Sequence, residues 1–196
     1  MTTTTVPTAH VRAALDNAEH WLRTLLPGLD PAGELHATAR QALAHCERTS
    51  EEAPGPIPDD YRPGQPGVLL RADRAALLAA CRAAQSDGLP ADVRVELSST
   101  LPAVLVAALR CYDLILGAVL LRAVAALLGN DAERVRGAID FLLAQQQPDG
   151  SFGAFGGELE ALGATEAAPR EDVPPEALLV PVTAACVAGL SAVMRG

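Results

Sequence analysis

Apolar residues recur every three or four positions over residues 8–26, the spacing of one stripe along an amphipathic helix. Pro27-Gly28 ends this helix. Asp30 followed by Pro31 has the pattern of an N-cap and first helical residue, and predicts a second helix over 31–47. The short connection predicts that the two helices pack as an antiparallel hairpin.

Residues 48–67 contain five prolines and three glycines. Neither a helix nor a central strand tolerates that composition. The segment is either a linker between two helical halves or an ordered flap that acts as a lid over a site, and the sequence leaves both open.

The central part of the chain predicts a helix over 70–85 and a long apolar helical region from Pro102 to Leu128, with a possible break near Gly117. Residues 91–97 alternate between apolar and polar, but one strand alone has no partner, so we expect a short helix or an extended lead-in. Gly129 is the expected end of the region.

Asn130 and Glu133 have the spacing of a capping box and predict the start of another amphipathic helix. That helix leads into an irregular loop over 148–175. The last helix is expected over 176–194, with Pro181 near its start or at a kink.

These patterns, together with a composition dominated by Ala and Leu, predict an all-α fold. The length of 196 residues suits a single helical domain. The chain carries a net charge of −9 and no basic cluster, which argues against nucleic acid and anionic membranes as partners. Arg110, Asp113 and Arg122 interrupt the apolar region 101–128, so it is expected to be a core helix and not a membrane span.

The cysteines are widely spaced and form no CxxC pair, which favours reduced, buried thiols in a cytoplasmic protein. They are Cys46, Cys81, Cys111 and Cys186. The N-terminal residues show no basic region followed by an apolar run, so no signal peptide is predicted.

The most distinctive motif is the end of the helix that precedes the 148–175 loop. It combines a basic-Gly pair, an aromatic-Leu pair, a glutamine, a glycine and an aromatic residue: Arg136-Gly137, Phe141-Leu142, Gln146, Gly150 and Phe152. This resembles the glutamine/aromatic repeat of the terpenoid cyclase and prenyltransferase-like α/α toroids, with Phe152 where many repeats carry Trp. A weaker echo, with Trp21-Leu22 before a Pro-Gly turn, lies near the N-terminus.

The resemblance implies antiparallel helical hairpins in a toroid-like arc around an apolar cavity, as in a short bacterial member of the superfamily. The chain has room for about four hairpins, so it predicts a partial barrel. In this motif Gln146, Gly150 and Phe152 are expected to hold the helices together: the glutamine bonds backbone groups at a helix end, and the glycine permits a left-handed turn. The acid motif and the magnesium motif of the cyclases are absent from the sequence.

Four polar residues interrupt the apolar region, and buried charge is costly unless it is paired. One interpretation is a structural ion pair between Arg110 and Asp113, three residues apart. The other is a site in which Asp113 is the acid or base, Tyr112 donates a hydrogen bond, and Arg110 and Arg122 hold an anionic or polar part of the substrate.

Trp21 and Thr183 complete the predicted substrate contacts, Thr183 because inner helices of the toroids line their cavity. His36 and His45 are nine residues apart and point to opposite sides of a helix, so no metal site is predicted, and these histidines are expected to be solvated or capping. No cofactor is predicted.

The sequence therefore favours a small-molecule enzyme, a cyclase or isomerase acting on an apolar natural-product intermediate. The alternative is a non-catalytic helical module that binds a partner protein or an apolar ligand. A homodimer or a biosynthetic partner protein is compatible with either function.

Overall fold

The computed structural model describes residues 8–47, 55–64, 73–130, 132–153 and 174–195. All regular elements of these residues are helical, which confirms the all-α prediction. In chain order they are α1 (Thr8–Leu25), the single 3-10 turn η1 (Leu26–Gly28), α2 (Glu34–Cys46), α4 (Arg74–Ala84), α5 (Ala91–Arg110), α6 (Leu114–Leu128), α7 (Glu133–Leu143) and α9 (Pro175–Arg195).

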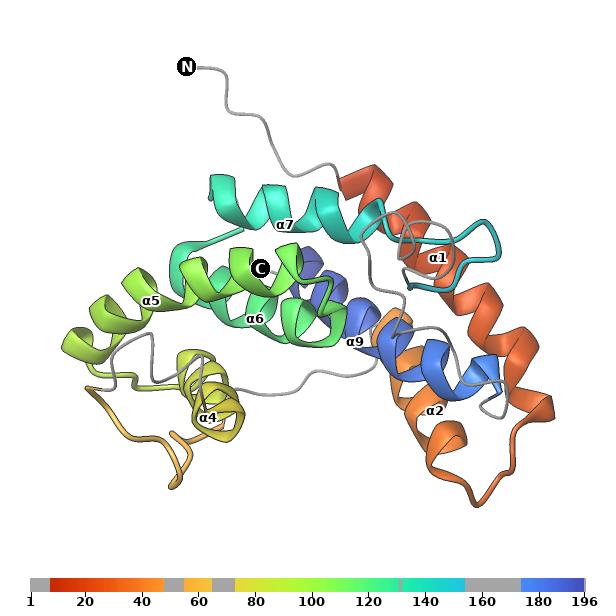
Figure 1. Cartoon of the computed structure of the whole chain (residues 1–196), viewed down its shortest axis with the longest axis horizontal. Helices are drawn as coiled ribbons and strands as arrows, with labels where there is room; N and C mark the ends of the chain where they lie inside the picture. Colours follow the sequence, from red (N-terminus) through yellow and green to blue (C-terminus); the bar gives the residue numbers. More distant parts are fainter. Residues whose placement is uncertain (1–7, 48–54, 65–72, 131, 154–173, 196) are drawn as a thin grey trace.

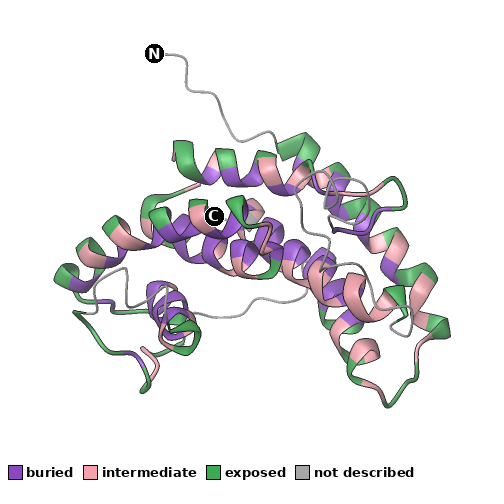
Figure 2. Ribbon diagram, in the orientation of Figure 1, coloured by how far each residue is buried: buried purple, intermediate pink, exposed green. Residues whose placement is uncertain are grey.

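Helices α6 and α9 form the centre of the fold. α6 packs against α4, α5, α7 and α9, and α9 also packs against α1 and α2. Figure 1 shows α4 and α5 at one end of the molecule and α1 and α2 at the other, with α7 crossing above the centre. The exposed residues gather on the outer faces of these peripheral helices (Figure 2), while α6 and α9 carry few.

One large apolar core contains residues of α1, α4, α5, α6, α7 and α9. A smaller cluster lies between α1, α2 and the start of α9. Small residues let the central helices approach closely. A Cβ at Gly189 of α9 would lie 3.0 Å from the carbonyl oxygen of Ala118 in α6. The hydrophobic stripes seen in the sequence therefore meet in a shared core.

Helix α9 is long and apolar enough to cross a membrane by length and composition, and 44% of that stretch is buried inside the fold. Its contacts with α1, α2 and α6 give its apolar residues partners within the described part of the chain.

The apolar region 101–128 is divided differently from the prediction. The break lies at Cys111–Asp113, not at Gly117, and Pro102 lies inside α5, not at its start. Residues 91–97 form the first turns of α5, where Val93 and Leu97 are buried and Val95 is 71% exposed. The alternation that resembled a strand therefore reflects two apolar residues four apart on one face of a helix.

Two predicted helix starts are wrong by a few residues. Asp30 accepts a bond from the backbone N–H of Ala32 in a turn, and the N-cap of α2 is Gly33. The capping box is absent: the N-cap of α7 is Ala132. Asn130 instead donates to the carbonyl oxygen of Val193, at 2.7 Å, and so ties the α6–α7 connection to α9.

Within the proline-rich segment 48–67, the structure describes residues 55–64, and these pack on the α4–α5 end of the fold. Tyr61 is buried, Asp60 pairs with Arg82 of α4 at 2.6 Å, and the backbone N–H of Gly64 donates to Glu96 of α5. This part of the segment is an ordered strap on α4 and α5. Most of the 148–175 loop lies outside the described residues.

Candidate functional site

The glutamine/aromatic motif forms a tight turn after α7, here called the Gln146 turn (residues 145–153). The side-chain amide of Gln146 donates to the carbonyl oxygens of Ala14 in α1, at 2.8 Å, and of Gly150, at 3.1 Å. Gln146 and Phe152 also form an isolated antiparallel bridge. The glutamine thus joins the end of α7 to the middle of α1. Its structural role is as predicted, but its partner Ala14 lies within a helix and not at a helix end.

The aromatic end of the same turn reaches α9. Phe152 is fully buried, and its backbone N–H donates to the hydroxyl oxygen of Thr183 at 2.9 Å. Thr183 is itself fully buried, so its hydroxyl is committed to holding the turn. Trp21 packs in the smaller cluster between α1 and α2. Its Cβ also lies 3.4 Å from the position of a Cβ built at Gly150, so both predicted substrate contacts lie beside the Gln146 turn.

A surface groove of about 430 Å³ lies between α5 and α7, here called the α5–α7 groove. The two helices run side by side in the same direction (Figure 1). The α5 wall consists of Leu105, Val106, Leu109 and Arg110. The α7 wall consists of Glu133, Arg134, Gly137, Ala138 and Phe141. The groove thus has an apolar floor and three charged residues, one acidic and two basic.

The α5–α6 connection adjoins the groove. The ring of Tyr112 lies 5.6 Å from that of Phe141, at 55° between the ring planes. This tilted arrangement is a favourable geometry for an aromatic pair. Tyr112 has φ +53°, which is uncommon for a residue with a Cβ. The strained backbone turns the chain sharply from α5 into α6 and directs the ring towards α7.

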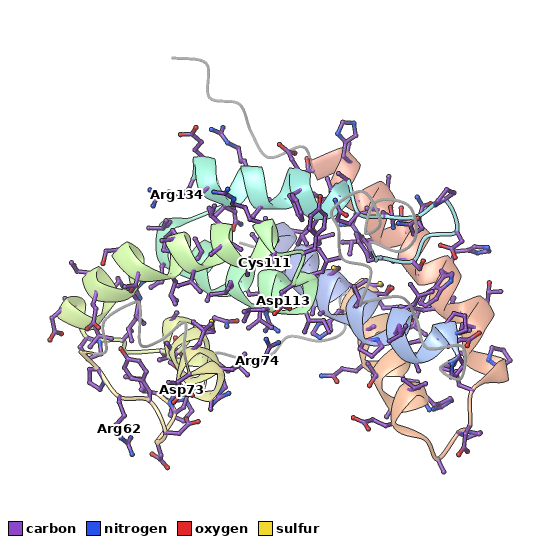
Figure 3. The ribbon with its side chains drawn as sticks, viewed as in Figure 1. Arg62, Asp73, Arg74, Cys111, Asp113 and Arg134 are labelled. Atoms are coloured by element: carbon purple, nitrogen blue, oxygen red, sulfur yellow. The ribbon has the colours of Figure 1, made fainter. Side chains whose placement is uncertain are left out.

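Asp113 makes its contacts away from the groove, with α6 and α4. One carboxylate oxygen accepts from the backbone N–H of Leu116 and caps α6, and the other pairs with Arg74 of α4 at 2.9 Å (Figure 3). The predicted local pair between Arg110 and Asp113 is wrong, because Asp113 pairs across the fold with Arg74.

The structure therefore does not bring the predicted site residues together. Arg110 lines the groove, and Tyr112 borders it through Phe141. Asp113 lies at the start of α6 with Arg74, and Arg122 is half-buried further along α6. The groove was not predicted from the sequence, although Gly137 and Phe141 belong to the glutamine/aromatic motif.

The cysteines and histidines only partly follow the prediction. Burial raises the pKa of the Cys46, Cys81 and Cys186 thiols to about 12, whereas Cys111 is exposed, so the expectation of burial is wrong for it. His36 is half-buried, and His45 is buried in the last turn of α2, so His45 is not a solvated histidine. Among the described residues, no three His, Cys, Asp or Glu side chains are grouped so as to hold a metal ion.

Comparison of the chain with protein-family models, with curated proteins and with solved structures found no match.

Proposed function

We propose that the protein is a helical binding module that holds an apolar small molecule in the α5–α7 groove. The main support for this proposal is the groove itself, because its volume of about 430 Å³ is in the range of small-molecule sites. Its floor consists of the buried residues Leu105, Leu109 and Ala138, and the apolar surface open to a ligand comes from Val106, 45% exposed, and the half-buried Phe141. Covering this surface with an apolar molecule removes it from water, which favours binding.

The dimensions favour a small molecule over a docked helix. From Arg134 to Phe141 the α7 wall is about 10 Å long, at a rise of about 1.5 Å per residue. A stable protein interface covers about 800 Å² on each partner, which calls for a much longer surface. A compact ligand lying along two helical turns matches the groove.

Gly137 keeps the middle of the groove open. It is exposed, and a Cβ built at this position would have no atom within 4 Å. A large side chain here would occupy the space between the two walls. The Gly137→Leu variant is therefore expected to block the groove without disturbing the core.

The test is a fluorescence titration with phenylnaphthylamine, an uncharged apolar dye whose emission rises in apolar surroundings. The wild-type protein should bind the dye, Gly137→Leu should lose binding, and Ala37→Leu should retain it. Ala37 is an exposed position of α2 away from the groove, so it controls for an added surface leucine. Equal binding by all three proteins would place the dye elsewhere and overturn the proposal.

The enzyme alternative, a cyclase or isomerase, is favoured by one observation: the Tyr112 ring borders the groove beside Phe141. In that proposal the Tyr112 hydroxyl donates a hydrogen bond to the substrate, with Asp113 as the nearest carboxylate along the chain. Incubation with an apolar metabolite extract, followed by mass spectrometry, tests it. Turnover by the wild type that is lost in Tyr112→Phe would support catalysis. An unchanged extract would contradict the enzyme alternative and leave binding as the only supported function.

We also propose that the helices form part of an α/α toroid-like arc. The support is the Gln146 turn, whose glutamine, glycine and aromatic residue make the structural contacts expected of the repeat. An experimental structure of the whole chain would test the arc, because it would show whether successive hairpins turn around a common axis.

A further inference from the structure

The α5–α7 groove receives one arginine from each wall, Arg110 from α5 and Arg134 from α7. Both side chains belong to exposed residues. Within the described part of the chain, neither guanidinium has a hydrogen bond or an ion pair. By contrast, Arg74 and Arg82 of α4 and Arg23 of α1 are each paired with a carboxylate.

The groove is locally positive although the protein is acidic. Its lining contains two guanidinium groups and one carboxylate, that of Glu133. The chain as a whole has a net charge of −9. At physiological ionic strength, charges farther away than about 8 Å are largely screened. The lining residues therefore decide the sign of the charge that a bound ligand meets.

The start of α7 supports the same sign. α7 begins at Glu133, and no side chain caps its N-terminus. The N-terminal end of a helix carries a partial positive charge that favours an anion. α5 ends at Arg110 with the opposite polarity, so at this end the positive charge comes from the Arg110 guanidinium itself.

We propose that the ligand of this groove is an amphiphile: an apolar body against Val106 and Phe141, with an anionic group attracted by Arg110 and Arg134. The inference rests on the binding function proposed above and adds the ligand class. A carboxylate, sulfonate or phosphate group supplies the charge-assisted hydrogen bonds that these guanidinium groups otherwise make only with water.

The test compares two dyes with the same ring system, anilinonaphthalene sulfonate and its uncharged parent phenylnaphthylamine. The wild-type protein should bind the sulfonate about tenfold more tightly than the parent, the effect of about one charge-assisted hydrogen bond. Arg110→Gln and Arg134→Gln should each reduce this preference. Glu133→Gln should increase it, because it removes a like charge from the lining.

Arg94→Gln is the matched control. Arg94 is an exposed arginine of the same helix α5 that does not line the groove, so the variant has the same change in net charge. It should retain the wild-type preference. A loss as large as in Arg110→Gln would show that overall charge is responsible and would overturn the proposal.

The two proposals fail in distinguishable ways. If both dyes bind equally well and Gly137→Leu abolishes both, the groove binds apolar molecules but the anion preference is wrong. If Gly137→Leu affects neither dye, the binding function itself is wrong. A preference for the sulfonate that survives the double variant Arg110→Gln/Arg134→Gln would also overturn the assignment to these arginines.

Discussion

The side-chain amide of Gln146 donates to the backbone carbonyl of Ala14, across 132 positions of the chain and at 2.8 Å. This contact fixes the end of α7 against α1. The same glutamine also bonds Gly150 within the Gln146 turn, while Phe152 reaches Thr183 of α9. Three helices that are distant in sequence are thus held at one point by one short turn.

Gln146→Ala is therefore expected to destabilise the protein by about 1–2 kcal/mol, since it removes two hydrogen bonds from a partly buried amide. Urea unfolding followed by circular dichroism measures the change. Gln41→Ala, at an exposed position of α2, is the control and should change the free energy of unfolding by less than about 0.5 kcal/mol. A similar small effect at Gln146 would show that the bonds to Ala14 and Gly150 do not stabilise the fold.

Gly150→Ala should be more damaging than the glutamine variant. Gly150 has φ +98°, and a Cβ there would lie 2.3 Å from the carbonyl oxygen of Asn17 in α1. Backbone strain of this kind costs about 1–3 kcal/mol, and the clash adds to it. We expect a loss of about 3 kcal/mol or more in the free energy of unfolding.

Gly88→Ala separates the two causes. Gly88 also has a positive φ, +73°, but a Cβ there would have open space around it. It should show the backbone strain alone, about 1 kcal/mol. If Gly88→Ala and Gly150→Ala destabilise the protein equally, the close approach of the turn to α1 is not what makes Gly150 necessary.

The Gln146 turn was predictable because its pattern is local: a glutamine, a glycine and an aromatic residue at fixed spacing specify the turn on their own. The α5–α7 groove was not, because its walls are more than twenty residues apart in sequence, and nothing in either helix shows that they run side by side. The break at Cys111–Asp113 was also missed. Polar residues mark this point, but the turn is made by Tyr112 at positive φ, without the glycine or proline that usually indicates a break.

Asp113 shows how a residue type can mislead. A charged residue in an apolar stretch suggested buried charge, but Asp113 ends one helix and starts the next, where a carboxylate is a common N-cap. Its partner Arg74 lies 39 positions away, beyond the reach of any pattern along one helix. The sequence could rank Asp113 as unusual, and only the fold shows what it contacts.

Two variants separate the roles of Asp113. Asp113→Asn keeps an N-cap for α6 and removes the ion pair with Arg74, whose side chain is 58% exposed, so it should cost less than about 1 kcal/mol. Asp113→Ala removes both and should cost about 1–2 kcal/mol. Thermal unfolding distinguishes them. If Asp113→Asn is as destabilising as Asp113→Ala, the ion pair and not the cap stabilises the start of α6.

Gly137→Ala should stabilise the protein. Gly137 lies within α7, where glycine is less favourable than alanine by about 0.5–1 kcal/mol, and a Cβ there meets no other atom. The free energy of unfolding should rise by that amount. Because alanine fills little of the groove, dye binding should persist. A destabilised Gly137→Ala would show that the backbone at this position has to approach another group closely.

The four thiols should differ in reactivity and in their effect on stability at high pH. Burial raises the pKa of Cys46, Cys81 and Cys186 to about 12 from the ordinary value of 9.0, whereas Cys111 is exposed. Ellman's reagent at neutral pH should therefore modify one thiol rapidly, and Cys111→Ser should abolish this rapid phase.

The raised pKa values of the three buried thiols stabilise the folded protein fully below pH 9. This contribution is lost as the pH rises from 9 towards 12, because the unfolded chain ionises first. The free energy of unfolding should accordingly fall between pH 9 and pH 11, and less steeply in Cys186→Ala, whose thiol is fully buried in the wild type. Equal slopes in the two proteins would show that the Cys186 thiol does not contribute to the alkaline loss of stability.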